Sequence, residues 1–388
     1  MSLAEYTGKL VSKLPGTGTT IFTVMSAFAN ECNAINLSQG FPNFPASIEL
    51  IDKVHHYMKA GYNQYAPMAG IMPLREVIAK KIQELYMTNY NPEKEITITS
   101  GGTQAIYTAI TCLVQKGDEI LVFEPAYDCY VPAIELAGGT PVFISLQYPA
   151  YKIDWEEVKK KITPRTRVIM INTPHNPTGA VWSREDMMNL EKITVGTDIV
   201  IVSDEVYEHI IFDGVQHESV CRYPRLAQRS FVIFSFGKTY HTTGWKMGYC
   251  LAPSALMTEF RKCHQFIVFC SNTAVQYALA DFMKQKEHYL ELPSFYQRKR
   301  DYFLRLIEGS AFTFTPASGS YFQLLNYERL SEEKDTDYAI RLTRETGVAS
   351  IPVSVFYNKP ADSHILRFCF AKTDATLEKA AERLVALK

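Results

Sequence analysis

Between residues 95 and 253 the chain repeats one pattern, in which a short apolar run rich in Val and Ile alternates with a stretch of helical spacing. Runs that are apolar at every position are typical of strands buried on both faces of a parallel sheet. A last run at 247–253 brings the expected sheet to seven strands. We therefore predict an α/β fold whose large domain holds a mostly parallel seven-stranded sheet between helices. The six earlier runs are 95–100, 119–124, 140–146, 167–172, 198–204 and 231–236.

The sequence on either side of this pattern differs, which divides the chain into three parts. Residues 1–45 look irregular and are expected to pack with the C-terminal part, because they lack a core of their own. Residues 46–285 form the expected large domain. Residues 286–388 begin with a charged helix and are expected to form a smaller α+β domain. Apolar residues at helical spacing predict further helices over 47–60, 74–86 and 105–114.

Composition excludes several classes of protein. The 388 residues carry a formal net charge of -1, which gives no reason to expect nucleic acid or a membrane surface as partner. No apolar stretch approaches the length of a transmembrane helix, and the N-terminus lacks the apolar core of a secretory signal. The eight cysteines form no Cys-x-x-Cys pair, which favours free thiols in a reducing cytoplasm. The nine histidines show no metal-ligand spacing, so we expect no metal site.

Polar side chains gather where the apolar runs end. Ligands of open parallel sheets bind beyond the carboxyl ends of the strands, so these turns predict one shared site. The Gly-Gly-Thr-Gln turn offers free N–H groups at a helix N-terminus, which suits an anion, although a plain strand-to-helix turn has the same composition. It matches neither the dinucleotide-binding nor the P-loop fingerprint. The five turns are 101–104, 125–128, 173–179, 204–207 and 235–238.

Each of these residues also has an ordinary structural explanation when it is taken alone. Asp204 can be an N-cap or part of a salt bridge, and the segment 175–179 can be merely a turn. Arg367 lies in the apolar run ILRFCFAK, where its charge needs an anionic partner, either an acidic residue of the protein or a ligand carboxylate. Lys238 and Lys246 frame a Ser/Thr/Gly loop, which suggests a bound anion.

Taken in this order and spacing, the turns resemble the class I and II aminotransferases, which are fold type I enzymes that depend on pyridoxal 5′-phosphate. The similarity covers nearly the whole chain, and the HNPTG, DEVY and SFGK elements are highly specific. Within the family, the chain looks most like the branch of methionine and kynurenine aminotransferases (cysteine-conjugate β-lyases). The matching segments are LSQGFP (37–42), NQYAP (63–67), SGGTQA (100–105), NTPHNPTG (172–179), SDEVYE (203–208), SFGKTYHTTGWKMG (235–248) and LRFCFAK (366–372).

The resemblance implies a role for each matching residue. Lys238 is expected to form a Schiff base with the cofactor and to move the substrate Cα proton. Asp204 is expected to pair with the pyridine nitrogen and keep it protonated, while Asn176 and Tyr207 hydrogen-bond the 3-oxygen of the ring. Lys246 stands where the family usually has a phosphate-binding arginine, so it offers a point charge without the bidentate fork.

The same resemblance implies further contacts to the cofactor. Gly102, Thr103 and Ser235 are expected to bind the phosphate together with the helix N-terminus. Tyr127 is expected to stack on the face of the ring. Gln104 lies in the cofactor-binding turn, but the resemblance specifies no role for it.

For the substrate, the resemblance implies that Arg367 binds the α-carboxylate, with the backbone N–H of Gly40 nearby. Phe22 falls where the branch places an aromatic ring against the substrate side chain. Tyr65 resembles the tyrosine that reaches the phosphate of the neighbouring subunit's cofactor, so we expect an obligate homodimer.

We therefore predict a ping-pong aminotransferase that moves the amino group of methionine or an aromatic amino acid, such as kynurenine, to a 2-oxo acid. A pyridoxal-phosphate-dependent β-lyase that cleaves cysteine S-conjugates is the alternative, because it would use the same residues and differ only in its products. A non-catalytic regulator is a second rival. It would carry an additional DNA-binding domain, for which we expect no room in this chain, and it would not need an intact Lys238.

Overall fold

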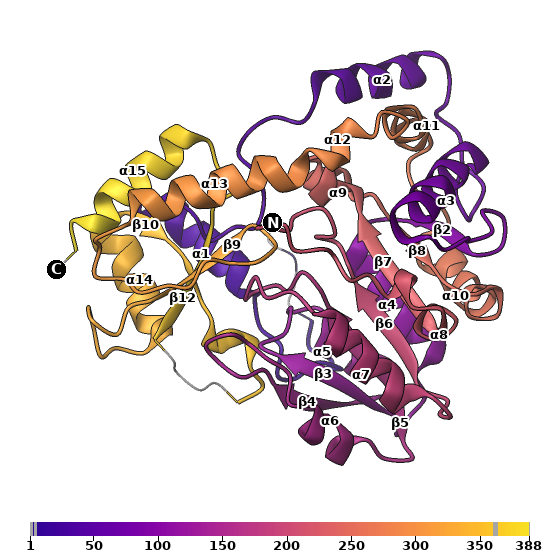
Figure 1. The fold of residues 1–388 in the computed structure, drawn as a ribbon, viewed down its shortest axis with the longest axis horizontal. Coiled ribbons are helices and arrows are strands. Elements are labelled where there is room, and N and C mark those ends of the chain that lie inside the picture. Colours follow the sequence, from indigo (N-terminus) through magenta and orange to yellow (C-terminus); the bar gives the residue numbers. More distant parts are fainter. Residues whose placement is uncertain (1–2, 4–5, 360–363, 388) are drawn as a thin grey trace.

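The computed structural model describes residues 3, 6–359 and 364–387. Its centre is one seven-stranded sheet with the strand order β2-β8-β7-β6-β5-β3-β4 (Figure 1). Neighbouring strands are parallel except around β8, which runs antiparallel to both β2 and β7. The predicted α/β fold with a mostly parallel sheet is thus confirmed. The strands are β2 (Ile96–Thr99), β3 (Glu119–Glu124), β4 (Thr140–Ser145), β5 (Thr166–Asn172), β6 (Val200–Asp204), β7 (Ser230–Ser235) and β8 (Gly248–Leu251).

Helices pack on both faces of this sheet, as the continuous apolar runs predict. The helices of this part are α2 (Ile48–Lys59), α3 (Met72–Tyr86), α4 (Gly102–Leu113), α5 (Tyr130–Leu136), α6 (Trp155–Lys161), α7 (Arg184–Thr194), α8 (Pro224–Ala227), α9 (Phe236–Thr239), α10 (Ser254–Ile267), α11 (Thr273–Phe282) and α12 (Glu287–Leu290). Strand β7 shows the division, because successive side chains of a strand point to opposite faces. Phe231 and Ile233 join a core with α4, α5 and α10, whereas Val232 and Phe234 join a core that includes α3, α7 and α11.

The C-terminal part forms a second, smaller layer of structure beside the large sheet. Its three-stranded antiparallel sheet has the order β11-β12-β9, helix α14 packs against β11 and β12, and α13 packs against α15. Figure 1 shows these orange and yellow elements gathered on one side of the molecule. The elements are α13 (Leu292–Leu306), β9 (Phe322–Asn326), α14 (Asp335–Thr346), β10 (Val348–Ala349), β11 (Ile351–Pro352), β12 (Ile365–Cys369) and α15 (Asp374–Val385). Three short 3₁₀ helices complete the chain, namely η1 (Val220–Arg222), η2 (Thr243–Trp245) and η3 (Ser354–Phe356).

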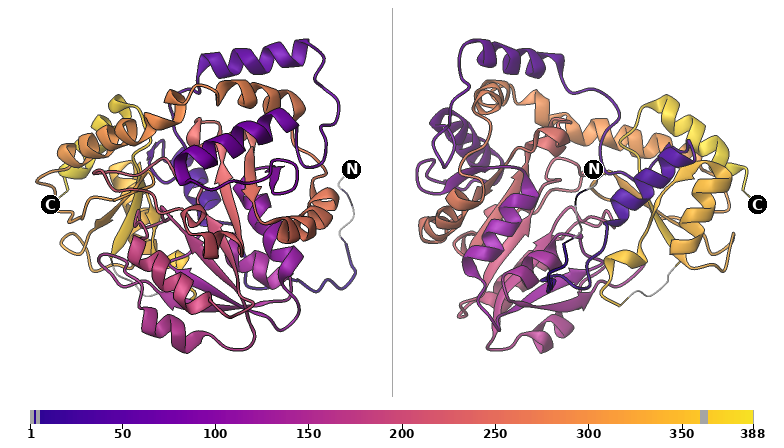
Figure 2. Two further views of the ribbon diagram at one scale, coloured as in Figure 1. Left: turned by 45° about the vertical axis from the view of Figure 1, so that its right-hand side comes forward. Right: turned by 180° about the vertical axis from the view of Figure 1, so that it is seen from behind.

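The N-terminal segment is more regular than its sequence indicates. The expectation that residues 1–45 are irregular was wrong, because helix α1 (Ile21–Glu31) and strand β1 (Ile35–Asn36) lie within them. The side chain of Thr20 accepts a hydrogen bond from the Thr23 N–H and so caps the start of α1. Strand β1 pairs in parallel with β10, and α1 contacts α14 (Figure 2, right). Helix α1 and strand β1 therefore contact elements of the C-terminal part.

Candidate active site

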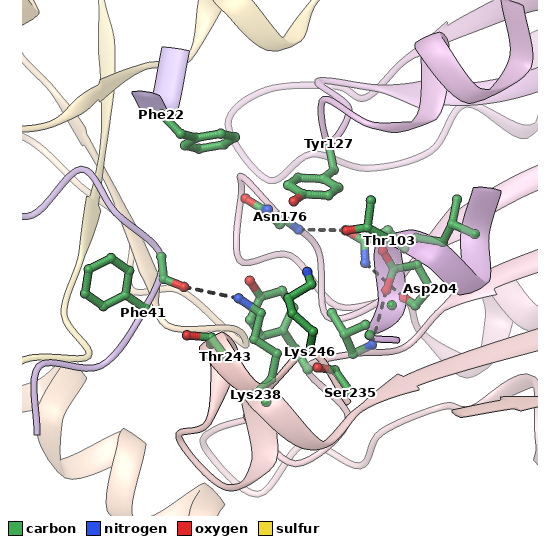
Figure 3. Close-up of a pocket in the computed structure, with 18 of the residues that line it drawn as sticks. Phe22, Phe41, Thr103, Tyr127, Asn176, Asp204, Ser235, Lys238, Thr243 and Lys246 are labelled. Carbon is green, nitrogen blue, oxygen red and sulfur yellow. Dashed lines mark hydrogen bonds between the residues drawn. The ribbon is translucent and has the colours of Figure 1, made fainter. Parts of the chain in front are cut away.

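A cavity of about 270 Å³ lies at the carboxyl ends of the large-sheet strands, where β9 and β12 of the small sheet approach them (Figure 3). Its walls come from the segments that follow β2, β3, β5, β6 and β7, from the segment before β8, and from α1, the 37–44 segment, β9 and β12. Twelve of the fourteen residues that the sequence singles out line this one cavity. They are Phe22, Gly40, Gly102, Thr103, Tyr127, Asn176, Asp204, Tyr207, Ser235, Lys238, Lys246 and Arg367.

Lys238 reaches the cavity from α9, the one-turn helix that follows β7. Its Nζ donates hydrogen bonds to the Tyr321 hydroxyl at 2.7 Å and to the Gly40 carbonyl at 3.1 Å. Burial lowers the pKa of Lys238 to about 8, and the nearby Arg367 charge acts in the same direction. Near neutral pH such a lysine is a neutral amine far more often than an exposed lysine is, so it can act as a base or a nucleophile.

Asp204 ends strand β6 and is the buried carboxylate of the cavity. The hydroxyl of Tyr130 donates to its Oδ2 at 2.6 Å, and the Val206 N–H donates to its Oδ1 at 3.3 Å. Burial raises the pKa of Asp204 to about 6, although both hydrogen bonds oppose the rise. Among the described residues Asp204 forms no ion pair, so the salt-bridge explanation does not hold there. A buried carboxylate without a cationic partner is suited to a protonated nitrogen of a ligand.

The turn after β2 forms an anion cradle. Gly101 has φ +83° and precedes the first turn of α4, a conformation that favours glycine. A Cβ placed on Gly102 would lie 3.0 Å from Val206 Cγ1, so the backbone at Gly102 packs closely against the Val206 side chain. The ammonium group of Lys246 lies next to the turn, 3.5 Å from the position of a Cβ on Gly101. Free N–H groups of a helix N-terminus and one ammonium therefore converge, which is the chemistry that binds a phosphate.

Arg367 on β12 is fully buried, and its surroundings answer the question that its sequence context raises. Its Nη1 donates to Asn176 Oδ1 at 2.7 Å, and its Nη2 donates to the Ser38 carbonyl at 2.9 Å. Among the described residues it forms no ion pair, and its Nε has no hydrogen-bond partner. Burial lowers its pKa to about 10, so the guanidinium stays charged. Arg367 is thus a fixed cation that still has donors for a ligand anion.

Aromatic rings surround this cation. The guanidinium lies 3.9 Å from the ring centroid of Phe322, 5.1 Å from that of Phe22 and 5.5 Å from that of Phe356. Phe22 also lies 6.3 Å from Tyr127, and Figure 3 shows both rings above the polar part of the cavity. The sequence singles out Phe22 and Tyr127 but misses the other two, which belong to the C-terminal part. These rings form an apolar wall beside the free donors of Arg367.

Sequence reasoning also missed the side chains that hold the catalytic groups from behind. Tyr130 lies three positions after Tyr127 and begins α5, directly after the polar turn that follows β3. Tyr321 directly precedes Phe322 and bonds Lys238, but nothing in its sequence context marks it.

Two predicted site residues lie outside the cavity. The Gln104 amide bonds the Ser100 N–H, the Thr108 hydroxyl and the His264 ring, so it fixes the turn and the start of α4 rather than facing the cavity. Gln104 thus supports the cofactor-binding turn in which the sequence places it. Tyr65 is 83% exposed and packs edge-on against Phe269, 5.3 Å away, on the outer surface.

Comparison with known proteins decides the family. The family model for aminotransferases of class I and II matches residues 33–384. The chain belongs to the class I and II aminotransferases. A methionine aminotransferase of Escherichia coli is 47% identical over 96% of this chain and 97% of its own length. Kynurenine–oxoglutarate transaminase 1 of Homo sapiens is 33% identical over 92% of this chain and 93% of its own length. A solved structure of an Escherichia coli protein with methionine aminotransferase function superposes with a TM-score of 0.96 at 47% identity, covering 98% and 100% of the two chains.

As a class I and II aminotransferase, the protein is an enzyme that depends on pyridoxal 5′-phosphate. The cavity fits this cofactor on its own chemistry, since it combines a buried carboxylate for a ring nitrogen, an anion cradle for a phosphate and a lysine amine. No cluster of three or more His, Cys, Asp or Glu side chains that could hold a metal occurs among the described residues. In the same ranges, no helix combines the length and apolar character needed to cross a membrane.

Proposed function

We propose that the protein moves the amino group of methionine or of an aromatic amino acid to a 2-oxo acid by a ping-pong reaction. The observation that carries this proposal is the buried, partly unsatisfied Arg367 beside a wall of aromatic rings. Arg367 suits the carboxylate shared by all amino acids, and the rings suit a long apolar or aromatic side chain. The 47% identity to a methionine aminotransferase supports the same choice.

For the cofactor, we propose that Asp204 pairs with the ring nitrogen and that Asn176 and Tyr207 bond the 3-oxygen. When bound, pyridoxal phosphate supplies an electron sink for the electrons released at the substrate Cα. Asp204 as an anion keeps the ring nitrogen protonated and so deepens that sink. The hydrogen bond from Tyr130 holds the carboxylate in place for this pairing.

We propose that the phosphate is bound by Gly102, Thr103, Ser235 and Lys246, while Tyr127 stacks on the ring. Lys246 adds charge but cannot form the paired hydrogen bonds of an arginine, so the helix N-terminus carries more of the binding. Gln104 supports the shape of this turn through its three protein partners.

We propose that Lys238 bonds the cofactor at rest and, once substrate displaces it, moves a proton at the substrate Cα. Its lowered pKa leaves the amine able to accept that proton near neutral pH. Arg367 holds the carboxylate, Gly40 lies beside it and Phe22 contacts the side chain, so that the Cα–H bond is oriented toward Lys238.

A single-turnover experiment tests the reaction. Cofactor-loaded protein is mixed with L-methionine in the absence of any 2-oxo acid, and the products are quantified. We expect one equivalent of 4-methylthio-2-oxobutanoate and one of pyridoxamine phosphate per site. A parallel reaction uses an S-conjugated cysteine in place of methionine. Pyruvate, ammonia and free thiol from it, without pyridoxamine phosphate, would instead support the β-lyase, which the comparisons do not favour.

We propose that the enzyme is a homodimer in which Tyr65 reaches the phosphate bound by the partner subunit. The exposed position of Tyr65 next to the half-exposed Phe269 supports a contact with a second copy. Lys238→Ala and Tyr65→Ala proteins should each be impaired. Unfolding and refolding them together should restore activity, because a mixed dimer then has one intact site. No recovery in mixed dimers would show that Tyr65 acts within its own chain.

Two further proposals concern the whole chain. The eight free cysteines support a location in the reducing cytoplasm. The pairing of β1 with β10 supports a division in which residues 1–45 join the small domain of residues 286–388, apart from a large domain of residues 46–285.

A further inference from the structure

Tyr321 lies behind Lys238, outside the cavity. It directly precedes β9, is fully buried and is not among the residues that line the cavity. Its hydroxyl accepts a hydrogen bond from Lys238 Nζ at 2.7 Å and donates one to the Gly40 carbonyl. Lys238 also donates to that carbonyl, at 3.1 Å. Tyr321, Lys238 and Gly40 therefore form a closed triangle of hydrogen bonds.

The direction of each hydrogen bond in this triangle is fixed by the protons available. Burial keeps the pKa of Tyr321 well above its usual value, so the phenol retains its only proton. The Gly40 carbonyl can only accept, so the Tyr321 hydroxyl donates its hydrogen bond there. The Tyr207 ring lies 5.1 Å from the Tyr321 ring, burial raises the pKa of Tyr207 as well, and the two neutral hydroxyls also interact with each other. The Tyr321 oxygen must therefore accept from Lys238.

A neutral lysine amine has two N–H bonds and one lone pair. In this triangle both N–H bonds are occupied, one by Tyr321 and one by Gly40. The bond to Cε and the two N–H bonds occupy three of the four tetrahedral positions on Nζ, so the lone pair takes the fourth. We propose that Tyr321 is a positioning residue that, with the Gly40 carbonyl, orients the lone pair of Lys238 toward the substrate Cα proton.

This inference rests on the proposed role of Lys238 and adds a reason why a flexible side chain works as a base. In the step, the Cα–H bond would break and an N–H bond would form on Lys238, and the bound cofactor would supply the electron sink for the pair of the broken bond. The resulting ammonium keeps both hydrogen bonds and directs its new N–H back at the cavity. Tyr321 thus also keeps the Lys238 ammonium in position to give the proton back later in the transfer.

The test compares Tyr321→Phe with Tyr296→Phe. Tyr296 is equally buried, its ring lies 5.9 Å from that of Tyr321, and its hydroxyl has no partner among the described residues, so it controls for loss of a buried hydroxyl in the same cluster. For Tyr321→Phe we expect kcat with methionine to fall ~10- to 100-fold, with KM changed less than ~3-fold, because positioned proton transfer contributes ~10²–10⁴-fold. With α-deuterated methionine, the primary isotope effect on kcat should increase. Tyr296→Phe should keep all three values.

A second readout uses cofactor-free protein. Hydrogen-bond acceptors stabilise the ammonium form, so loss of the Tyr321 hydroxyl should lower the pKa of Lys238 further. Reductive methylation of Lys238, followed by peptide mass spectrometry, should therefore reach its half-maximal rate at lower pH in Tyr321→Phe than in the wild type or Tyr296→Phe.

Unchanged kcat, isotope effect and labelling midpoint in Tyr321→Phe would overturn the inference. Full transamination by Lys238→Ala would instead refute the proposed role of Lys238, so the two failures are distinguishable. If Tyr321→Phe does not fold, 3-fluorotyrosine at position 321 replaces it, since it keeps ring and hydroxyl but weakens the oxygen as an acceptor. Smaller changes in the same directions are then expected, and their absence would equally overturn the inference.

Discussion

Replacing Arg367 by lysine separates the charge of this residue from its hydrogen-bonding geometry. A guanidinium has five N–H donors, of which one bonds Asn176 and one bonds the Ser38 carbonyl. Three donors remain, including the unpartnered Nε–H, so a carboxylate can be bound through two of them. A lysine ammonium has three donors, and the same two protein partners leave it one. Arg367→Lys should therefore cost one charge-assisted hydrogen bond to the substrate carboxylate.

Such a bond contributes ~1.5–3 kcal/mol, and ~1.4 kcal/mol corresponds to a tenfold change in rate. We expect kcat/KM for L-methionine to fall ~10- to 150-fold, whereas kcat/KM for its methyl ester, which lacks the carboxylate, should change little. Arg300→Lys is the matched control, because Arg300 is also buried but binds Asp213 away from the cavity. It should lower stability without changing either value. An equal loss for acid and ester in Arg367→Lys would refute the reasoning, because the effect would then be a general disturbance of the site.

Burial and backbone geometry lead to four further predictions. Because native Asp204 holds its proton up to a pKa of about 6, cofactor-free protein should lose stability as the pH rises from about 4 to about 6; urea unfolding of Asp204→Asn should lack this loss. In the wild type, affinity for pyridoxal phosphate should rise over the same range as Asp204 ionises, and titration of Asp204→Asn should show weaker binding without that rise. The rate of reductive methylation of Lys238 in cofactor-free protein should increase through pH about 8, well below the range of exposed lysines, and a midpoint near 10 would contradict the effect of burial. Gly101→Ala (φ +83°) should lose ~1 kcal/mol of stability, as should Gly61→Ala (φ +94°), but only Gly101→Ala should also weaken binding of the cofactor phosphate.

The large sheet and most of the cavity were predictable because their signals are local. Each strand is an unbroken apolar run, and Asp204 and Lys238 stand at or just after strand ends, where parallel strands bring ligand-binding groups together. Helix α1 was missed because its mixture of β-branched, Ser and Thr residues is a weak helix signal, and its contacts with β10 and α14 stabilise it from far along the chain.

The parts that the sequence did not reveal depend on distant contacts. Phe322 and Phe356 belong to the C-terminal part, where aromatic residues are ordinary core material, and only the fold brings them to Arg367. The orientation of Gln104 depends on His264 of α10, 160 positions away. A residue in a recognised motif can therefore be placed in the site by sequence, whereas the direction of its side chain follows from tertiary packing.

In the segment 204–208 at the end of β6, some side chains face the cavity and others pack in the core. Asp204 and Tyr207 face the cavity, but Glu205 and Glu208 are turned into the core behind it. Glu208 binds Lys81 of α3 and accepts a hydrogen bond from Tyr86 at 2.6 Å. Burial alone would raise the pKa of Glu208, but the ammonium of Lys81 outweighs it and holds the pKa below its usual value.

A buried ion pair of this kind contributes little net stability against apolar residues of the same volume, but breaking it by removing one partner costs ~3–5 kcal/mol. The Lys81–Glu208 pair matters for the site because it connects the turn that carries Tyr207 to helix α3 on one face of the sheet. Glu208, which does not touch the cavity, therefore helps to fix the turn that carries Tyr207, which does, and this gives a reason for a charged residue where an apolar one would pack as well.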